Sequence, residues 1–115
     1  MGAPSRDALW AIYDRLYDAI RAVDPDHMIT IEGAWGGWVG GTYLNWEWDV
    51  LPAPTVFGWS NVLYQMHAYA GDTSLNGEKW EVDKQVNGFL SHQSWNVPCF
   101  IGEFNNHGKI GRAHV

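Results

Sequence analysis

The sequence has one cysteine, few basic residues and no long apolar run, and each shortage excludes a class of protein. A lone Cys99 cannot close an internal disulfide, so the chain is no disulfide scaffold and its cysteine content indicates no compartment. Seven Lys and Arg stand against thirteen Asp and Glu, and the net charge of -6 argues against nucleic acid, which needs a basic surface. No stretch approaches the roughly 18 uninterrupted apolar residues of a membrane span. We therefore expect neither nucleic acid nor a membrane as a partner.

Aromatic residues, in contrast, are abundant. Eight Trp, five Tyr and four Phe in 115 residues exceed what one small core needs. We assign roughly half of them to ordinary packing between helices and sheet, and the rest can offer flat faces on which sugar rings stack. The composition therefore fits a neutral partner such as a polysaccharide.

Helical and extended patterns alternate along the chain. Apolar residues spaced three and four apart indicate a helix, and short apolar runs bounded by turn residues indicate strands. The predicted elements are a helix ending at Val23, strands over 27–33, 61–69 and 97–103, a helix over about 78–95, and a long loop rich in Gly, Trp and Pro over 33–60. This order predicts an α/β fold with parallel strands joined by crossovers. A loop of that length is usually functional.

The second and third predicted strands end in residues that can carry chemistry. The second ends in His67 and Tyr69, and the third ends in Glu103. Because alternate side chains of a strand share a face, we expect His67 and Tyr69 to point one way, and Cys99, Ile101 and Glu103 to point one way. If neighbouring parallel strands align their ends, His67, Tyr69 and Glu103 converge at one rim of the sheet.

The two predicted strands resemble strands six and seven of glycoside hydrolase family 5, the cellulase-type retaining β-glycanases. The resemblance covers Asn61 to Tyr69 and Val97 to Asn105. The resemblance implies a partial TIM (β/α)8 barrel, with residues 1–108 as a fragment of the catalytic domain from about helix four to strand seven. A whole barrel needs about 250 residues. The chain would then hold less than half of one.

The resemblance also implies catalytic roles. Glu103 matches the nucleophile, and His67 and Tyr69 match the strand-six pair, of which Tyr69 would hydrogen-bond the nucleophile. The family's acid/base Glu, in an Asn-Glu dipeptide at strand four, has no counterpart here, so the fragment alone is expected to be inactive. The alternatives are a solvated strand-end charge for Glu103 and a structural role for His67. A catalytic role for Glu32, at the end of the first strand, is not favoured.

Three residues are candidates for contact with the substrate. Trp35 takes the place of an aromatic sugar platform in the related enzymes, and Trp38 and Asn105 are the other two candidates. Packing is an equal alternative for Trp35, and it is favoured for four others: Trp38, Trp46, Trp48 and Trp59. No cofactor is implied, and the His residues lack metal-ligand partners at useful spacing, so we expect no metal.

The implied activity is hydrolysis of O-glycosidic bonds in a β-linked polysaccharide by a retaining double displacement, with an endo-β-1,4-glucanase favoured. Within the family, mannan, xyloglucan and mixed-linkage glucan remain alternative substrates. A carbohydrate-binding or interaction domain without chemistry is the alternative of another class, although two amphipathic helices do not suit a β-sandwich binding module. The full-length parent is expected to be secreted or displayed at the cell surface.

The last seven residues differ in pattern from the rest of the chain. Lys-Ile-Gly-Arg-Ala-His-Val, residues 109–115, has no apolar period, no cap and no counterpart in the family. Back-translated as AAG-ATC-GGA-AGA-GCA-CAC-GTC, it reads as the start of a common sequencing adapter. We predict that residues 109–115 are not native, and amplification of the gene from its source checks this. A genomic read that continues through these codons would contradict it; a natural surface tail is the alternative.

Overall fold

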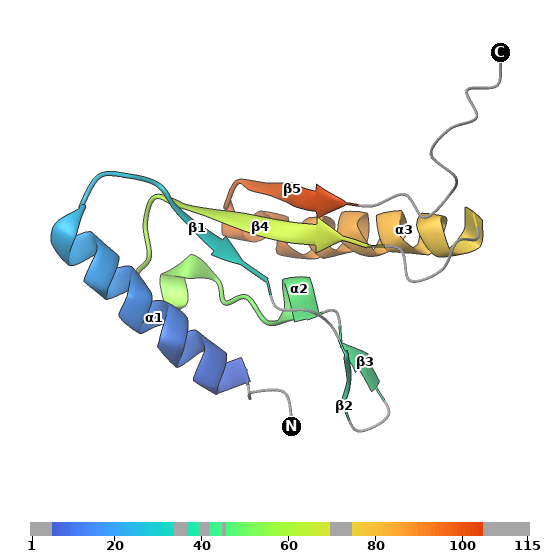
Figure 1. Ribbon diagram of the computed structural model, residues 1–115, viewed down its shortest axis with the longest axis horizontal. Coiled ribbons are helices and arrows are strands. Elements are labelled where there is room, and N and C mark those ends of the chain that lie inside the picture. Colours follow the sequence, from blue (N-terminus) through green and yellow to red (C-terminus); the bar gives the residue numbers. More distant parts are fainter. Residues whose placement is uncertain (1–5, 34–36, 40–41, 45, 70–74, 105–115) are drawn as a thin grey trace, which may run out of the picture.

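The computed structural model describes residues 6–33, 37–39, 42–44, 46–69 and 75–104, which form helices and strands (Figure 1). The helices are α1 (Arg6–Val23), α2 (Trp46–Asp49) and α3 (Leu75–His92), with 3-10 turns at Pro54–Val56 and Gln93–Trp95. The strands are β1 (Ile29–Glu32), β2 (Gly37–Val39), β3 (Thr42–Leu44), β4 (Val62–Ala68) and β5 (Cys99–Phe104).

The main sheet has three strands in the order β1-β4-β5, and both pairings are parallel. The three predicted strands and their parallel arrangement are therefore confirmed. Ile29 of β1 pairs with Val62, and Tyr64 of β4 pairs with Cys99 of β5. Figure 1 shows α1 beside β1 and α3 running along β4 and β5. Parallel strands with helices along them are the repeating unit of a (β/α) barrel.

The segment predicted as a plain loop, residues 33–60, contains regular structure. β2 and β3 form an antiparallel pair in which Trp38 is paired with Tyr43, and α2 and a 3-10 turn follow. The loop prediction was wrong here because strands of three residues and a helix of four are too short to show a period in the sequence.

One face of the sheet packs against the core. Tyr64 and Met66 of β4 are almost fully buried, and Ile31 of β1 lies beside them. Trp48 and Trp59 are 4% and 5% exposed, which confirms the packing role predicted for these two. The Trp59 ring stacks on Phe57 with centroids 5.1 Å apart. The opposite face of β4, which carries Leu63, Gln65 and His67, is only partly covered.

Helix α3 differs from its prediction in its limits and in its buried face. It begins at Leu75 rather than near residue 78, and its α-helical part ends at His92, because the last turn tightens to 3-10 before Asn96 takes a left-handed conformation (φ 54°). The buried positions are Glu81, Gln85 and Gly88. The apolar stripe predicted from the sequence is exposed instead, and consists of Val82, Val86, Phe89 and Leu90.

Gly88 explains how α2 reaches α3. A Cβ at this position would lie 2.5 Å from Nε1 of the Trp48 indole, so only glycine lets the ring lie on the helix backbone. Trp48 also donates from Nε1 to Oε1 of Gln85, at 2.8 Å. The buried face of α3 is therefore polar and small, and the exposed stripe suits contact with a further element of a barrel.

We predict that the 115-residue chain self-associates in solution. Apolar residues on α1 and α3 are about half exposed, among them Leu16, Val82 and Leu90 at 54%, 60% and 52%, and burying such surface is favourable at about 25 cal/mol per Å². Size-exclusion chromatography with light scattering should show oligomers. Val82→Lys with Leu90→Lys should reduce them, whereas Asn87→Lys, at an already polar exposed position, should not. A monodisperse wild-type monomer would contradict the prediction.

Candidate active site

Polar side chains collect at the carboxyl ends of the three parallel strands. Glu32 is the last residue of β1, Tyr69 follows the last residue of β4, and Glu103 is the penultimate residue of β5. Since the strands are parallel, their carboxyl ends lie at one edge of the sheet (Figure 1). That edge is where (β/α) barrels carry their active sites.

The Glu103 carboxylate is held by the two residues predicted to meet it. The Tyr69 hydroxyl donates to Oε2 of Glu103 at 2.5 Å. Nδ1 of His67 lies 3.6 Å from the same oxygen, within ion-pair distance. The structure thus brings Glu103, His67 and Tyr69 together, with both contacts on one carboxylate oxygen. The second oxygen, Oε1, takes part in neither of these contacts.

Glu103 reaches His67 through an irregularity that simple alternation does not predict. Met66 pairs with Ile101, but the next residue, His67, pairs with Glu103, so β5 has one extra residue, Gly102, at a bulge. The prediction that Ile101 and Glu103 share a face was therefore wrong. Regular alternation would have turned Glu103 to the face of Met66, and the bulge turns it to the face of His67.

The Gln65 side chain occupies the space beside the bulge residue, Gly102. A Cβ on Gly102 would lie 2.5 Å from Cδ and 2.8 Å from Cγ of Gln65, which fills that space on β4. Both distances are shorter than a van der Waals contact allows, so a larger residue would displace Gln65 or the β5 backbone. The glycine in Ile-Gly-Glu-Phe is therefore explained by the packing of its neighbour strand.

Helix α3 supports the backbone at His67. The buried amide of Gln85 donates from Nε2 to the His67 carbonyl at 3.0 Å and to Oε1 of Glu81 at 3.0 Å. This buried, hydrogen-bonded amide fixes the position of β4 along the axis of α3. Sequence reasoning missed this support, since Glu81 and Gln85 are polar residues next to an apolar stripe, and only the structure shows which side of the helix is buried.

Glu32 joins the site although the sequence did not favour it. Its Oε1 lies 3.1 Å from Nε2 of His67, on the opposite edge of the imidazole from Glu103. The main chain at Glu32 is also held, because the Tyr13 hydroxyl donates to its carbonyl at 2.7 Å. The signal that could have found it was its position at the end of a strand adjacent to β4.

The hydrogen bond between Tyr69 and Glu103 affects the ionisation of the phenol. The bond to the carboxylate is the main cause that raises the pKa of Tyr69 above its usual value, and partial desolvation and the negative charge of Glu103 act in the same direction. A Tyr with a raised pKa keeps its proton at neutral pH. Tyr69 therefore acts as a donor to Glu103.

The structure does not describe the side chains of the three predicted substrate-binding residues. Trp35 and Asn105 lie outside the described residues, and Trp38 is described only as a member of β2. Those assignments stay predictions.

Among residues 6–33, 37–39, 42–44, 46–69 and 75–104, no group of three or more His, Cys, Asp or Glu side chains could hold a metal ion. No helix in the described part of the chain is long and apolar enough to cross a membrane.

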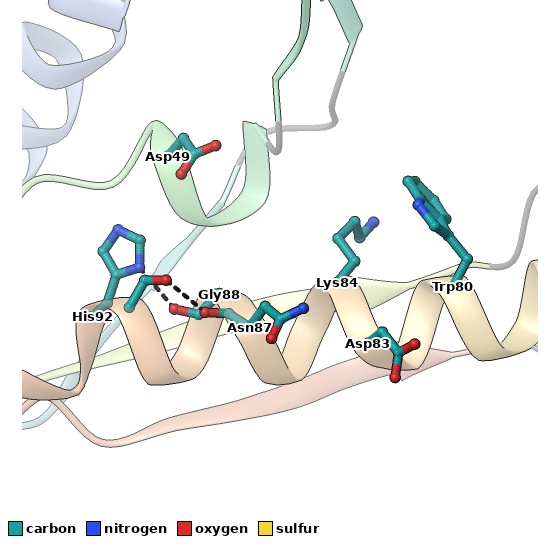
Figure 2. A pocket seen from close by; sticks show the side chains of 8 residues that line it. Asp49, Trp80, Asp83, Lys84, Asn87, Gly88 and His92 are labelled. Carbon is teal, nitrogen blue, oxygen red and sulfur yellow. Dashed lines mark hydrogen bonds between the residues drawn. The ribbon is translucent and has the colours of Figure 1, made fainter.

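A separate hollow of about 340 Å³ lies between α2 and α3, and Figure 2 shows its lining. It contains none of the residues at the strand ends. Its polar groups are engaged locally: the Ser91 hydroxyl donates to the Asn87 carbonyl at 2.7 Å, Nδ1 of His92 lies 2.8 Å from the Gly88 carbonyl, and Asp83 pairs with Lys79 at 2.5 Å. These contacts lie within α3, and none of them joins the hollow to the residues at the strand ends.

Parallel strands with flanking helices, and a carboxylate, an imidazole and a phenol gathered at their carboxyl ends, define part of a (β/α)8 barrel enzyme. A family model, Cellulase (glycosyl hydrolase family 5), matches residues 2–114. The chain belongs to this family, and so to the glycoside hydrolases that act on β-linked polysaccharides. No curated protein and no solved structure matches it.

The contact between Tyr69 and Glu103 predicts a linked titration. Glu103→Gln replaces the anionic acceptor by a neutral one, so the pKa of Tyr69 should fall towards its usual value. NMR of ¹³C-labelled tyrosine, titrated in the folded protein, measures this. Asp18→Asn, which removes a carboxylate from the exposed side of α1, is the control and should leave Tyr69 unchanged. An unchanged pKa in Glu103→Gln would show that the bond is not formed in solution.

Proposed function

We propose that this chain carries the nucleophile half of the active site of a retaining endo-β-1,4-glucanase, with Glu103 as the nucleophile. One observation supports this most directly: a strand-end carboxylate of a family 5 chain is held through Oε2 by a neutral phenol and an imidazole, Tyr69 and His67. A carboxylate that attacks an anomeric carbon must stay ionised and keep one rotamer. The hydrogen bond that the Tyr69 hydroxyl donates to one of its oxygens favours both conditions.

The proposed reaction is a double displacement. An oxygen of Glu103 forms a bond to the anomeric carbon while the glycosidic C–O bond breaks, and the leaving oxygen takes a proton from a second carboxylic acid. Water, deprotonated by that same group, then attacks the anomeric carbon and releases Glu103. Retaining enzymes hold the two carboxyl groups about 5–5.5 Å apart. We place the second group outside this chain, on the strand-four Glu of the family.

Tyr69 and His67 have distinct parts in this scheme. Tyr69 donates a short hydrogen bond that fixes the Glu103 rotamer, and its raised pKa keeps the proton on the phenol. His67, whose side chain is 16% exposed, lies against the same oxygen and shields that side from water. As the glycosyl ester forms, the carboxylate loses its charge, so both contacts must weaken during the first step.

A β-1,4-glucan is the proposed substrate, and the family description and the aromatic content support it. Trp35 and Trp38 are proposed to stack on sugar rings, and Asn105 to hydrogen-bond a hydroxyl group. Mannan, xyloglucan and mixed-linkage glucan are the alternatives, which a panel of soluble polysaccharides distinguishes. A domain without catalysis would bind such polymers and hydrolyse none of them.

We also propose that the parent enzyme is secreted or displayed at the cell surface, where such polymers are found.

Kinetics of the parent enzyme, completed with its upstream sequence, test the roles. Glu103→Gln keeps the shape and removes the nucleophile, so kcat should fall by at least about 10³-fold while binding of oligosaccharide survives. Tyr69→Phe removes one hydrogen bond to a charged group, and kcat should fall by about 10- to 100-fold. Isothermal calorimetry measures the binding. Full activity in Glu103→Gln would contradict the assignment.

Trapping the intermediate identifies the nucleophile directly. A 2-deoxy-2-fluoro glycoside slows the release of the glycosyl ester, and we expect mass spectrometry to find the label on the peptide of residues 97–108. The Glu103→Gln variant is the matched control and should remain unlabelled. A label on any other peptide would exclude Glu103 as the nucleophile.

A further inference from the structure

His67 lies between two carboxylates that come from different strands. Nε2 is 3.1 Å from Oε1 of Glu32 on β1, and Nδ1 is 3.6 Å from Oε2 of Glu103 on β5. The His67 side chain is 16% exposed, while those of Glu32 and Glu103 are 50% and 54% exposed. The imidazole is therefore the most enclosed of the three groups, and both of its nitrogens face an acid.

The strand register places Glu32 on the side of the ring opposite to Glu103. Glu32 pairs with Gln65, two residues before His67, and the next main-chain amide, Gly33, donates to the Gln65 carbonyl at 3.1 Å. Tyr13 also holds the Glu32 carbonyl. The Glu32 side chain thus starts from a fixed backbone, and its carboxylate reaches Nε2 from the β1 side.

Gln65 competes for the same nitrogen. Its Nε2 lies 3.0 Å from Nε2 of His67, and an amide nitrogen can only donate, whereas a carboxylate can only accept. Hydrogen bonds to an ionised acceptor are roughly twice as strong as neutral ones, so the Glu32 contact favours the arrangement in which His67 donates from Nε2. In that arrangement the Gln65 amide must turn its oxygen, rather than the nitrogen that lies at 3.0 Å, towards Nε2 of His67, and the two amide atoms are close enough in size to exchange places.

We propose that Glu32 is a positioning residue of the active site, which accepts the Nε2–H of His67 and thereby fixes the imidazole with Nδ1 against Glu103. A carboxylate on one nitrogen sets the tautomer and the orientation of a histidine, and so what its other nitrogen presents. The inference rests on the proposed function, since it assigns Glu32 a part in aligning the nucleophile. It gives β1 a role in the site as well as β4 and β5.

A double-mutant cycle in the completed enzyme tests this. Glu32→Met removes the acceptor at similar length, and kcat on an activated aryl glycoside should fall about 10-fold or more with KM changed less than about twofold. Glu32→Gln keeps an acceptor at the same reach and should recover part of the rate. Because Glu32 acts through His67, Glu32→Met should add less than about twofold to the loss in His67→Ala. Asp18→Asn is the control for removing a negative charge and should behave as wild type.

The outcomes are distinguishable. Wild-type kcat in Glu32→Met would overturn the inference, as would multiplicative losses in the double variant or a rise in KM alone, which would indicate direct contact with substrate. Melting curves check that each variant is folded, and the fluoro-sugar label should still appear on residues 97–108 in Glu32→Met, only more slowly. Activity in Glu103→Gln would instead remove the proposed function itself, whatever Glu32 does.

Discussion

The parallel pairing of β4 with a strand on each side is the constraint on which the rest of the structure depends. It brings the ends of three strands to one edge, so that Glu32, Tyr69 and Glu103, which are far apart in sequence, become neighbours. Arg21 joins the amino ends of β1 and β4 at the opposite edge of the sheet. Its guanidinium donates to the carbonyls of His27 and Asn61 at 2.6 and 3.1 Å, just before these strands begin. With the entry points fixed, the register sets which side chains meet at the exits.

The two faces of this sheet have different tasks. The face of Tyr64 and Met66 is buried against aromatic and aliphatic side chains and belongs to the apolar core. The face of Gln65 and His67 carries polar groups and would line the inside of a closed barrel. The Gly102 bulge connects these tasks, since it lets β5 keep Ile101 in register with Met66 while Glu103 is turned to His67. One irregular residue of β5 thus decides which of its side chains lies opposite His67.

Support for the site also comes from the helix layer. Gln85 is bonded at once to the Trp48 indole and the His67 carbonyl, so α2, α3 and β4 are fixed relative to one another close to the imidazole. A polar residue in such a place costs free energy unless each of its groups is paired. We interpret this buried network as a device that fixes the end of β4 at the cost of burying polar groups.

The sequence by itself determined α1, α3 and the three strands of the main sheet, their parallel arrangement and the strand-end positions of His67, Tyr69 and Glu103, because apolar periodicity and terminal polar residues are local signals. It did not predict β2, β3 and α2, which are too short to show a period. It could not show the bulge at Gly102, since a bulge is a feature of the pairing between β4 and β5, and the space beside this glycine is filled by Gln65 of the other strand. Nor could it show that α3 buries Gln85 rather than Val86, or that Glu32 meets His67. Those features are decided by which elements become neighbours, and neighbours across a sheet are set by tertiary packing and register, which no local pattern encodes.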